Sequence, residues 1–273
     1  MEGVQVRRNP KNGFVVFQLH YNADPSKRDS DEIRLLKAAM PVAQFNQEFE
    51  ISWESFAGMP VYQDFQPKRH CASEKPEPWI GLPMLRGWDF GLTPACIIAQ
   101  LQGQQLVVFR EFTSFNMGAE QFCEKIMPQV HQLYPGMKFF DFADPAGVAR
   151  AQSNETTCFE ILAKFGITPI PGPVAWEKRR SSVEHFLVRK TREGEAFAIY
   201  EADCPTLVRG FKGGYRYPEK AKDIEPERLR PIKDIHSHPQ DALQYIAAGV
   251  REGGLRSGSA QIPTQRYFQG ASS

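Results

Sequence analysis

From residue 84 onward, short apolar runs alternate with breaks that contain glycine or proline. Three of these runs have the length and the β-branched and aromatic content of strands, namely LRGWDFGL (85–92), ACIIAQLQ (95–102) and QLVVFREF (105–112). The breaks between them are short enough for hairpins and too short for crossover connections. The pattern therefore predicts an antiparallel three-stranded meander.

The chain after the meander alternates between helical and extended patterns. Helices are predicted over 119–134, where an apolar stripe runs from Phe122 to Leu133, and over 155–165, 176–192 and a last segment that starts near Pro239. Extended runs lie between them at 138–144, 167–170 and 196–200. Strands that alternate with helices favour parallel pairing. We therefore predict an α/β protein with a ribonuclease H-like fold, whose mixed central sheet joins an antiparallel meander to parallel strands, with helices on both faces.

Composition limits the location and the partners of the protein. The formal net charge is only +1, from 33 basic and 32 acidic residues, so any surface that binds nucleic acid must be local. The five cysteines form no C-x-x-C pair, which argues against a zinc cluster and against a disulfide framework. No apolar run approaches about 18 residues, so we expect a soluble intracellular protein that does not bind a membrane.

Asp89 and Asp144 occupy unusual places in the predicted strands. Strand alternation puts Asp89 on the side of Gly87 and away from Trp88, and neither side suits a lone carboxylate. Asp144 ends the run 138–144, and Pro145 after it ends the pairing, so its carboxylate lies at a strand's carboxyl end, where open α/β sheets hold their sites. Both have ordinary alternatives, since either aspartate could simply belong to a turn.

Asp241 is the third aspartate of interest. It follows Pro239 by two residues and falls in the first turn of the last helix if His238 is the cap, where its ordinary role would be to complement the helix dipole. Three carboxylates within about 4 Å of one another would repel by about 4 kcal/mol per pair at an effective dielectric near 20, so such a cluster needs cations.

Oxygen-only ligands favour hard ions. Two Mg²⁺ or Mn²⁺ ions can clamp an in-line displacement at phosphorus. Asp89, Asp144 and Asp241 are therefore predicted to be catalytic and metal-binding, with two such ions, and the predicted reaction is phosphodiester hydrolysis.

Two further residues compete for roles near this site. His238 precedes Asp241 by three residues and is a candidate metal ligand or proton carrier, with helix capping as the ordinary alternative. Asp141 is the rival of Asp144, but alternation points it to the opposite face of the sheet. We predict that Asp141 instead forms a hydrogen bond with a neighbouring helix or loop.

The stretch 176–222 carries an excess of basic residues. Contacts with DNA phosphates would use such residues, although a solvated surface is the commoner reason for them. The candidates for DNA binding are Lys178, Arg179, Arg180, Arg209, Lys212 and Arg216.

Three strings, taken together in their order and spacing, resemble the nuclease domain of the large terminase subunit of tailed bacteriophages. They are GWDFGLTPA (87–95), DPAG (144–147) and SHPQDALQY (237–245). Upstream, LHYNADP (19–25), QEFE (47–50) and FAGMPVYQDF (56–65) resemble the end of that family's motor domain and its connection to the nuclease. The likeness covers roughly residues 15 to 250.

The resemblance implies an endonuclease that cuts double-stranded viral DNA concatemers during genome packaging, with Asp89, Asp144 and Asp241 matching the family's acidic triad. It also implies a motor ATPase domain, a small terminase subunit and a portal as partners, and action in the host cell cytoplasm without incorporation into the mature particle. The sequence contains no G-x-x-x-x-G-K-[ST] loop, so we expect no ATPase activity in this chain, which is either a fragment of a longer protein or a separate subunit.

The predicted organisation is an N-terminal arm and linker over 1–83, resembling the end of a motor domain, a nuclease domain over 84–253, and a disordered tail over 254–273. Two alternative functions remain open. One is a non-catalytic DNA-binding packaging module, and the other is a resolvase-like or transposase-like nuclease with the same fold.

Overall fold

The structure, a computed structural model, describes residues 4–8, 13–28, 30–39, 58–90, 93–148, 157–192, 194–218 and 229–252. By its packing the chain divides into two compact units, residues 1–61 with 211–232 and residues 62–210 with 233–273. This division follows contacts within the chain, and the functional boundaries predicted at residues 83 and 253 stay predictions. The predicted tail over 254–273 and the string QEFE lie outside the described residues.

Among the described residues, the N-terminal part of the first unit contains a hairpin and two helical segments, and a short paired strip joins it to residues 215–217. Strands β1 (Val4–Arg8) and β2 (Val15–Leu19) pair antiparallel, and η1 (Tyr21–Ala23) and α1 (Asp31–Ala39) follow them. In the strip, the Val61 N–H donates to the Tyr215 carbonyl at 3.0 Å, and the Tyr217 N–H donates to the Met59 carbonyl at 2.9 Å. Residues distant in sequence are therefore joined within this unit.

The second unit is built on a mixed sheet, which in the described residues has six strands in the order β10-β5-β4-β3-β6-β7. The antiparallel meander is β3 (Met84–Asp89), β4 (Ala95–Gln102) and β5 (Gln105–Thr113), as the spacing predicted. Strands β6 (Phe139–Ala143) and β7 (Ile170–Pro171) extend it in parallel beyond β3, and β10 (Phe197–Ile199) pairs parallel with β5. This is the predicted ribonuclease H-like architecture.

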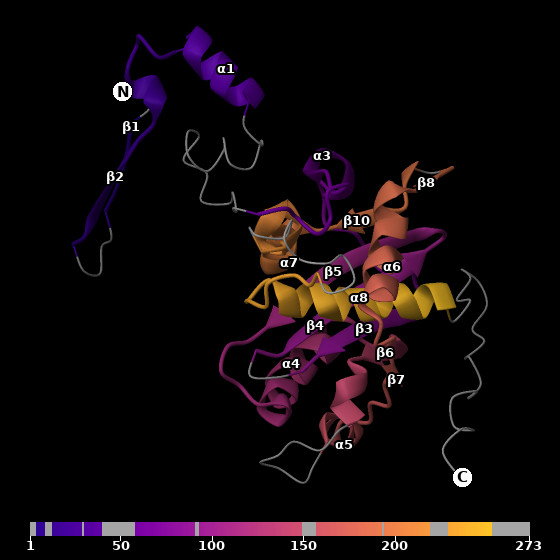
Figure 1. The fold of residues 1–273 in the computed structure, drawn as a ribbon. Coiled ribbons are helices and arrows are strands. Elements are labelled where there is room, and N and C mark those ends of the chain that lie inside the picture. The colour runs from indigo at the N-terminus through magenta and orange to yellow at the C-terminus, as the bar shows by residue number, and fades with distance from the viewer. Residues whose placement is uncertain are drawn as a thin grey trace. The chain divides into compact units, whose positions relative to one another are not determined.

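Helices cover both faces of this sheet (Figure 1). The last helix, α8 (Ser237–Glu252), crosses one face over β3, β4 and β6, and α6 (Trp176–Val188) packs on it. On the other face, α4 (Ala119–Leu133) and α5 (Cys158–Lys164) enclose an apolar core that includes Trp88, Phe122, Ile126 and Leu162. Because alternate residues of β3 point to opposite faces, Trp88 enters this core while Asp89 lies on the α8 side, as predicted.

The remaining elements are short. They are α3 (Pro67–His70), η2 (Pro145–Val148), the hairpin of β8 (Lys190–Thr191) and β9 (Gly194–Glu195), η3 (Glu201–Asp203), α7 (Pro205–Arg209) and η4 (Gly210–Gly214). The α3 segment packs closely within the second unit: His70 is fully buried, and its Nε2 lies 3.1 Å from the Leu187 carbonyl oxygen. No helix within the described ranges has both the length and the apolar character needed to cross a lipid bilayer.

Several predicted boundaries were wrong by a few residues. The helix predicted over 155–165 begins at Cys158, because Thr157 forms a capping box with Glu160, while residues 155 and 156 lie outside the described residues. The helix predicted over 176–192 ends at Val188, because the β8–β9 hairpin follows it. The extended run predicted over 167–170 is paired only from Ile170.

Candidate active site

Asp89 and Asp144 lie at the ends of neighbouring parallel strands. Trp88 of β3 pairs with Ala143 of β6, and Asp89 and Asp144 are the residues that directly follow these two in sequence. The Asp144 N–H donates to the Trp88 carbonyl oxygen at 3.2 Å, which continues the pairing by one bond. Asp144 Oδ1 accepts a hydrogen bond from the Ala146 N–H at 2.9 Å, so η2 holds its side chain after the strand has ended. The two carboxylates therefore come from one edge of the sheet.

Helix α8 adds Asp241 to this edge. The helix can approach β3 closely because residue 87 is glycine: a Cβ there would come within 2.0 Å of the Ala242 carbonyl oxygen. Asp241 is only 1% exposed, and three residues earlier on the same helix His238 Nδ1 lies 2.7 Å from Asp89 Oδ2. Close packing of strand and helix thus brings a third carboxylate to the strand ends.

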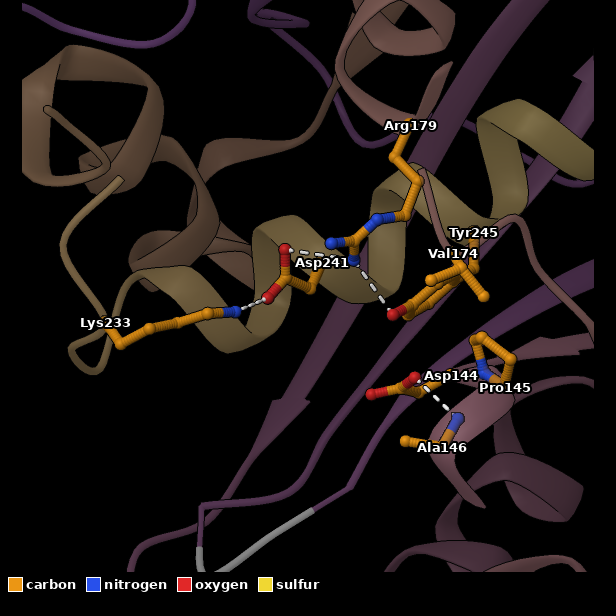
Figure 2. Close-up of a pocket in the computed structure, with 8 residues that line it drawn as sticks. All are labelled: Asp144, Pro145, Ala146, Val174, Arg179, Lys233, Asp241 and Tyr245. Carbon is orange, nitrogen blue, oxygen red and sulfur yellow. Dashed lines mark hydrogen bonds and ion pairs between the residues drawn. The ribbon is translucent and has the colours of Figure 1, made fainter. Parts of the chain in front are cut away.

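Asp144 and Asp241 face a common cavity of about 470 Å³. Figure 2 shows the two carboxylates approaching it from the end of β6 and from α8, with the Arg179 guanidinium and the Tyr245 hydroxyl beside them. The lining residues are Asp144, Pro145, Ala146, Val174, Arg179, Lys233, Asp241 and Tyr245. Asp89 is not among them, and it is only 5% exposed.

Burial controls the ionisation of Asp89. Removal of its carboxyl group from solvent raises the pKa of Asp89 to about 6. The hydrogen bond with His238 lowers this pKa, and the negative charge of Asp241 raises it. His238 Nδ1 lies 2.7 Å from Asp89 Oδ2. The capping role considered for His238 was wrong, because α8 begins one residue earlier, at Ser237, and the imidazole turns toward Asp89 instead. For the same reason Asp241 is the fifth residue of the helix and lies beyond its first turn.

Two basic side chains neutralise the buried Asp241. The Lys233 ammonium contacts Asp241 Oδ2, and Arg179 Nη1 lies 3.5 Å from Asp241 Oδ1. Arg179 also donates to the Tyr245 hydroxyl at 2.8 Å, and its guanidinium lies 5.2 Å from the centre of the Tyr245 ring. Burial raises the pKa of Tyr245 well above its usual value, so this phenol stays protonated. The aspartate therefore sits between a lysine and a fixed arginine.

Asp141 lies on the opposite face of the sheet, as alternation predicted. Its two oxygens accept hydrogen bonds from Arg86 Nε at 2.7 Å and Arg86 Nη2 at 2.8 Å, and Oδ1 also accepts from Trp88 Nε1 at 2.7 Å. The predicted partner, a neighbouring helix or loop, was wrong, because Arg86 and Trp88 both belong to the adjacent strand β3. Asp141 is therefore committed to a buried ion pair within the sheet.

The predicted DNA-binding residues are distributed over several elements. Arg179 lines the cavity, Lys178 is exposed on the same helix, Arg180 lies 3.5 Å from Glu184, and Arg209 is exposed at the end of α7. Lys212 and Arg216 belong to the first unit, where Arg216 donates to the Gly214 carbonyl at 2.9 Å. Of the six, only Arg179 lines the described cavity.

Five of the residues that line the cavity were not predicted as site residues, and two of them, Pro145 and Ala146, directly follow Asp144. Tyr245 follows Asp241 by four residues, and this helical spacing would have placed both on one face of α8. Lys233 and Val174 lie in irregular segments, and no periodic pattern connects them with the aspartates. Only the folded chain brings them to the cavity.

The donor set suits a hard divalent cation, because it offers carboxylate oxygens and no thiolate. Within the described ranges, no group of three or more His, Cys, Asp or Glu side chains is arranged to hold a metal ion as the side chains stand. Lys233 and Arg179 provide the positive charge beside Asp241. The residues thus fit the ion in chemistry, and side-chain movement would be needed to bind it.

No protein-family model matches the sequence, and no curated protein matches it either. Solved structures do resemble the fold. The large terminase of a thermophilic bacteriophage superposes with a TM-score of 0.55 at 18% identity, over 85% of this chain and 55% of that one. The same protein in complex with ADP gives a TM-score of 0.57 at 16% identity, again over 85% of this chain and 55% of that one.

The nuclease domain of the P22 large terminase gives a TM-score of 0.50 at 11% identity, over 72% of this chain and 93% of that domain. By contrast, the chain spans only about 55% of the length of the large terminase from the thermophilic bacteriophage. The resemblance to large terminases predicted from the sequence is confirmed at the level of the fold.

Proposed function

We propose that this protein is an endonuclease that cuts double-stranded viral DNA concatemers during genome packaging and depends on Mg²⁺ or Mn²⁺. In this proposal Asp89, Asp144 and Asp241 form the catalytic centre and hold the ions, two in number. One observation carries the proposal: strand register and helix packing bring these three aspartates, which are up to 152 positions apart in sequence (241 − 89), to one edge of the sheet. Carboxylates that converge on one edge of a sheet repel one another unless cations lie beside them.

Each side chain has a distinct task in the proposed site. Asp144 is the most accessible of the three aspartates and faces the cavity, so it is the first that an entering ion would meet. Asp89 is oriented by His238, and Asp241 by the cations beside it. When bound, the ions would lower the pKa of a water molecule and neutralise the charge that develops on the phosphate. Arg179, with its position fixed by Tyr245, would orient a phosphate that enters the cavity.

The wider setting is proposed from the family resemblance. Since the chain spans about 55% of the length of the large terminase from the thermophilic bacteriophage, we propose that it works with a motor ATPase domain, together with a small terminase subunit and a portal, in the host cell cytoplasm. The basic side chains proposed to contact DNA would bind its phosphates by charge, so these contacts would not depend on the base sequence. They are Lys178, Arg179, Arg180, Arg209, Lys212 and Arg216.

A plasmid nicking assay tests the proposal. Supercoiled plasmid should be nicked and linearised with Mn²⁺ or Mg²⁺, and excess EDTA should stop the reaction. Asp144→Asn should abolish cutting, whereas Asp64→Asn, at an exposed position of the same unit, should cut like the wild type. DNA binding without cutting under all these conditions would favour a non-catalytic packaging module. A strong preference for branched DNA over linear duplex would favour a resolvase-like enzyme.

A further inference from the structure

We infer that Lys233 is an exchangeable counter-ion of Asp241. Its ammonium group pairs with this carboxylate until a divalent ion binds, and it then forms an ion pair with a phosphate of the nucleic acid instead. The inference rests on the proposed function, because it assigns the entering ion to the same aspartates. It adds a substrate-binding residue and a coupling between metal binding and DNA binding.

Two cations contact Asp241, and they are held very differently. The side chain of Arg179 is 14% exposed, and that of Lys233 is 64% exposed. Both approach the same carboxylate, whose own side chain is only 2% exposed. The buried charge of Asp241 therefore has one sheltered partner and one partner at the solvent boundary.

Arg179 is fixed by contacts that do not involve Asp241. It donates to the Tyr245 hydroxyl at 2.8 Å, and its guanidinium lies 5.2 Å from the Tyr245 ring centre and 5.8 Å from that of Trp176. The arginine also emerges from a regular helix, α6, that packs on α8. Moving Arg179 would break this whole set of contacts.

Lys233 has no comparable support. It lies in an irregular segment ahead of α8, and within the described part of the chain its only hydrogen bond or ion pair is the one with Asp241. A lysine ammonium ends a flexible four-carbon stem and can bond in many directions, so it can leave the carboxylate without any backbone movement. Of the two cations, Lys233 is thus the one that an entering ion would displace.

The cavity gives the displaced ammonium a destination. Lys233 and Arg179 line the same cavity as Asp144, at the edge of the sheet where the proposed ions bind. Once a divalent ion has neutralised Asp241, the freed lysine lies at the solvent boundary beside this cavity, and an incoming phosphate supplies the negative charge that it has lost. Metal binding therefore creates a phosphate contact that the metal-free protein lacks.

The test compares Lys233→Gln with Lys164→Gln. Lys164 is a matched control because its side chain is 54% exposed and it also pairs with a carboxylate, that of Glu120, at 2.6 Å. Mn²⁺ affinity is measured by titration calorimetry without DNA. Because the competing cation is removed, Lys233→Gln should bind Mn²⁺ about two- to fivefold more tightly than the wild type, as expected for a partly exposed ion pair. Lys164→Gln should match the wild type.

Affinity for a labelled duplex is measured by fluorescence anisotropy in EDTA and in Ca²⁺. In Ca²⁺, Lys233→Gln should bind the duplex several-fold more weakly, and the slope of log affinity against log salt should fall in magnitude by about 0.9, the value for one lost phosphate contact. In EDTA the substitution should leave DNA affinity unchanged, because Asp241 then holds the lysine. Lys164→Gln should change neither measurement.

The possible failures separate the inference from the proposed function. If the wild type binds Mn²⁺, Asp144→Asn loses that binding, and Lys233→Gln changes neither Mn²⁺ affinity nor metal-dependent DNA affinity, the exchange is refuted and the metal site stands. If Lys233→Gln weakens DNA binding equally in EDTA and in Ca²⁺, Lys233 is a permanent phosphate contact and the exchange is again refuted. If the wild type and Asp144→Asn both fail to bind Mn²⁺, the proposed function itself fails.

Discussion

Gly87 of β3 lies directly against the backbone of Ala242 in α8, so closely that a Cβ carbon on residue 87 would come within 2.0 Å of the Ala242 carbonyl oxygen. It would also come within 2.8 Å of Ile246 Cγ1. Backbone atoms of a packed helix cannot move aside as a flexible side chain can. This glycine therefore sets the distance between the strand that carries Asp89 and the helix that carries Asp241.

Gly87→Ala should push α8 away from β3. We expect overpacking to lower the free energy of unfolding by about 1–3 kcal/mol, and cutting to fall more than stability does, because Asp241 moves with the helix. Urea denaturation and plasmid nicking check this. Gly118→Ala is the control, since a Cβ at Gly118 would have nothing within 4 Å. Wild-type activity in Gly87→Ala would contradict the assigned position of Asp241.

Asp144→Asn and Asp141→Asn should have opposite effects. Asp144 faces the cavity, so its substitution should abolish cutting and, because it removes a repulsive charge, keep or raise the melting temperature in EDTA. Asp141→Asn removes the charge that pairs with the buried Arg86, so it should lower stability by up to about 3 kcal/mol while leaving cutting near wild-type at temperatures where it is folded. Melting curves and nicking rates check both. The reverse pattern of activity would refute the site.

The sequence was most informative where structure depends on near neighbours. Strand length, hairpin spacing and alternation predicted the meander and the opposite faces of Asp89 and Trp88, because these properties repeat every two residues along a strand. The same alternation separated Asp141 from Asp144. The predicted ends of the helices were less accurate. The capping box at Thr157 determines where α5 begins, and α8 begins at Ser237, two residues before Pro239.

The environment of each carboxylate could not be read from the sequence. Lys233 and Arg179 meet on Asp241 only because an irregular segment and α6 both pack beside α8. Arg86 was not recognised as the partner of Asp141, because that pairing requires β3 and β6 to be adjacent and in register. Such contacts between distant parts of the chain carry no periodic signal, so the charged partners of the site emerged only from the fold.

The stability of the fold should decrease at a pH low enough to protonate His70 in the unfolded chain. Burial and the nearby Arg69 charge lower the pKa of His70, and its ring is held by the Gln66 N–H and the Leu187 carbonyl. In the unfolded chain the pKa returns to about 6.5, so as pH falls below that value the unfolded state takes up a proton that the folded state does not. Stability is thus unaffected by this group above about pH 6.5 and is lost progressively below it.

His70→Gln should remove this component of the acid sensitivity. Urea denaturation between about pH 7.5 and pH 5 should give a flatter dependence of stability on pH than in the wild type, even if the variant is less stable throughout. His131→Gln, at an exposed position of α4, serves as the control and should keep the wild-type slope. An unchanged slope in His70→Gln would place the acid sensitivity elsewhere.

Asp89 should have the opposite effect on the pH dependence of stability. Burial raises its pKa from 3.8 to about 6, so between these values the folded protein binds a proton that the unfolded chain has released. Without metal, stability is therefore lost as pH rises through this range, by up to about 3 kcal/mol once Asp89 is ionised. Asp89→Asn mimics the protonated acid and escapes this loss.

The difference in stability between Asp89→Asn and the wild type isolates this group from the other titrating residues. In EDTA, the variant's advantage should be small near pH 4.5 and grow to its full size near pH 7. Mn²⁺ should then reduce the advantage, because a bound cation stabilises the ionised carboxylate of the wild type and has less to bind in the variant. Melting temperatures at several pH values, with EDTA and with Mn²⁺, measure both effects. If the variant's advantage in stability does not change with pH or with Mn²⁺, Asp89 neither has a raised pKa in the folded protein nor binds the ion.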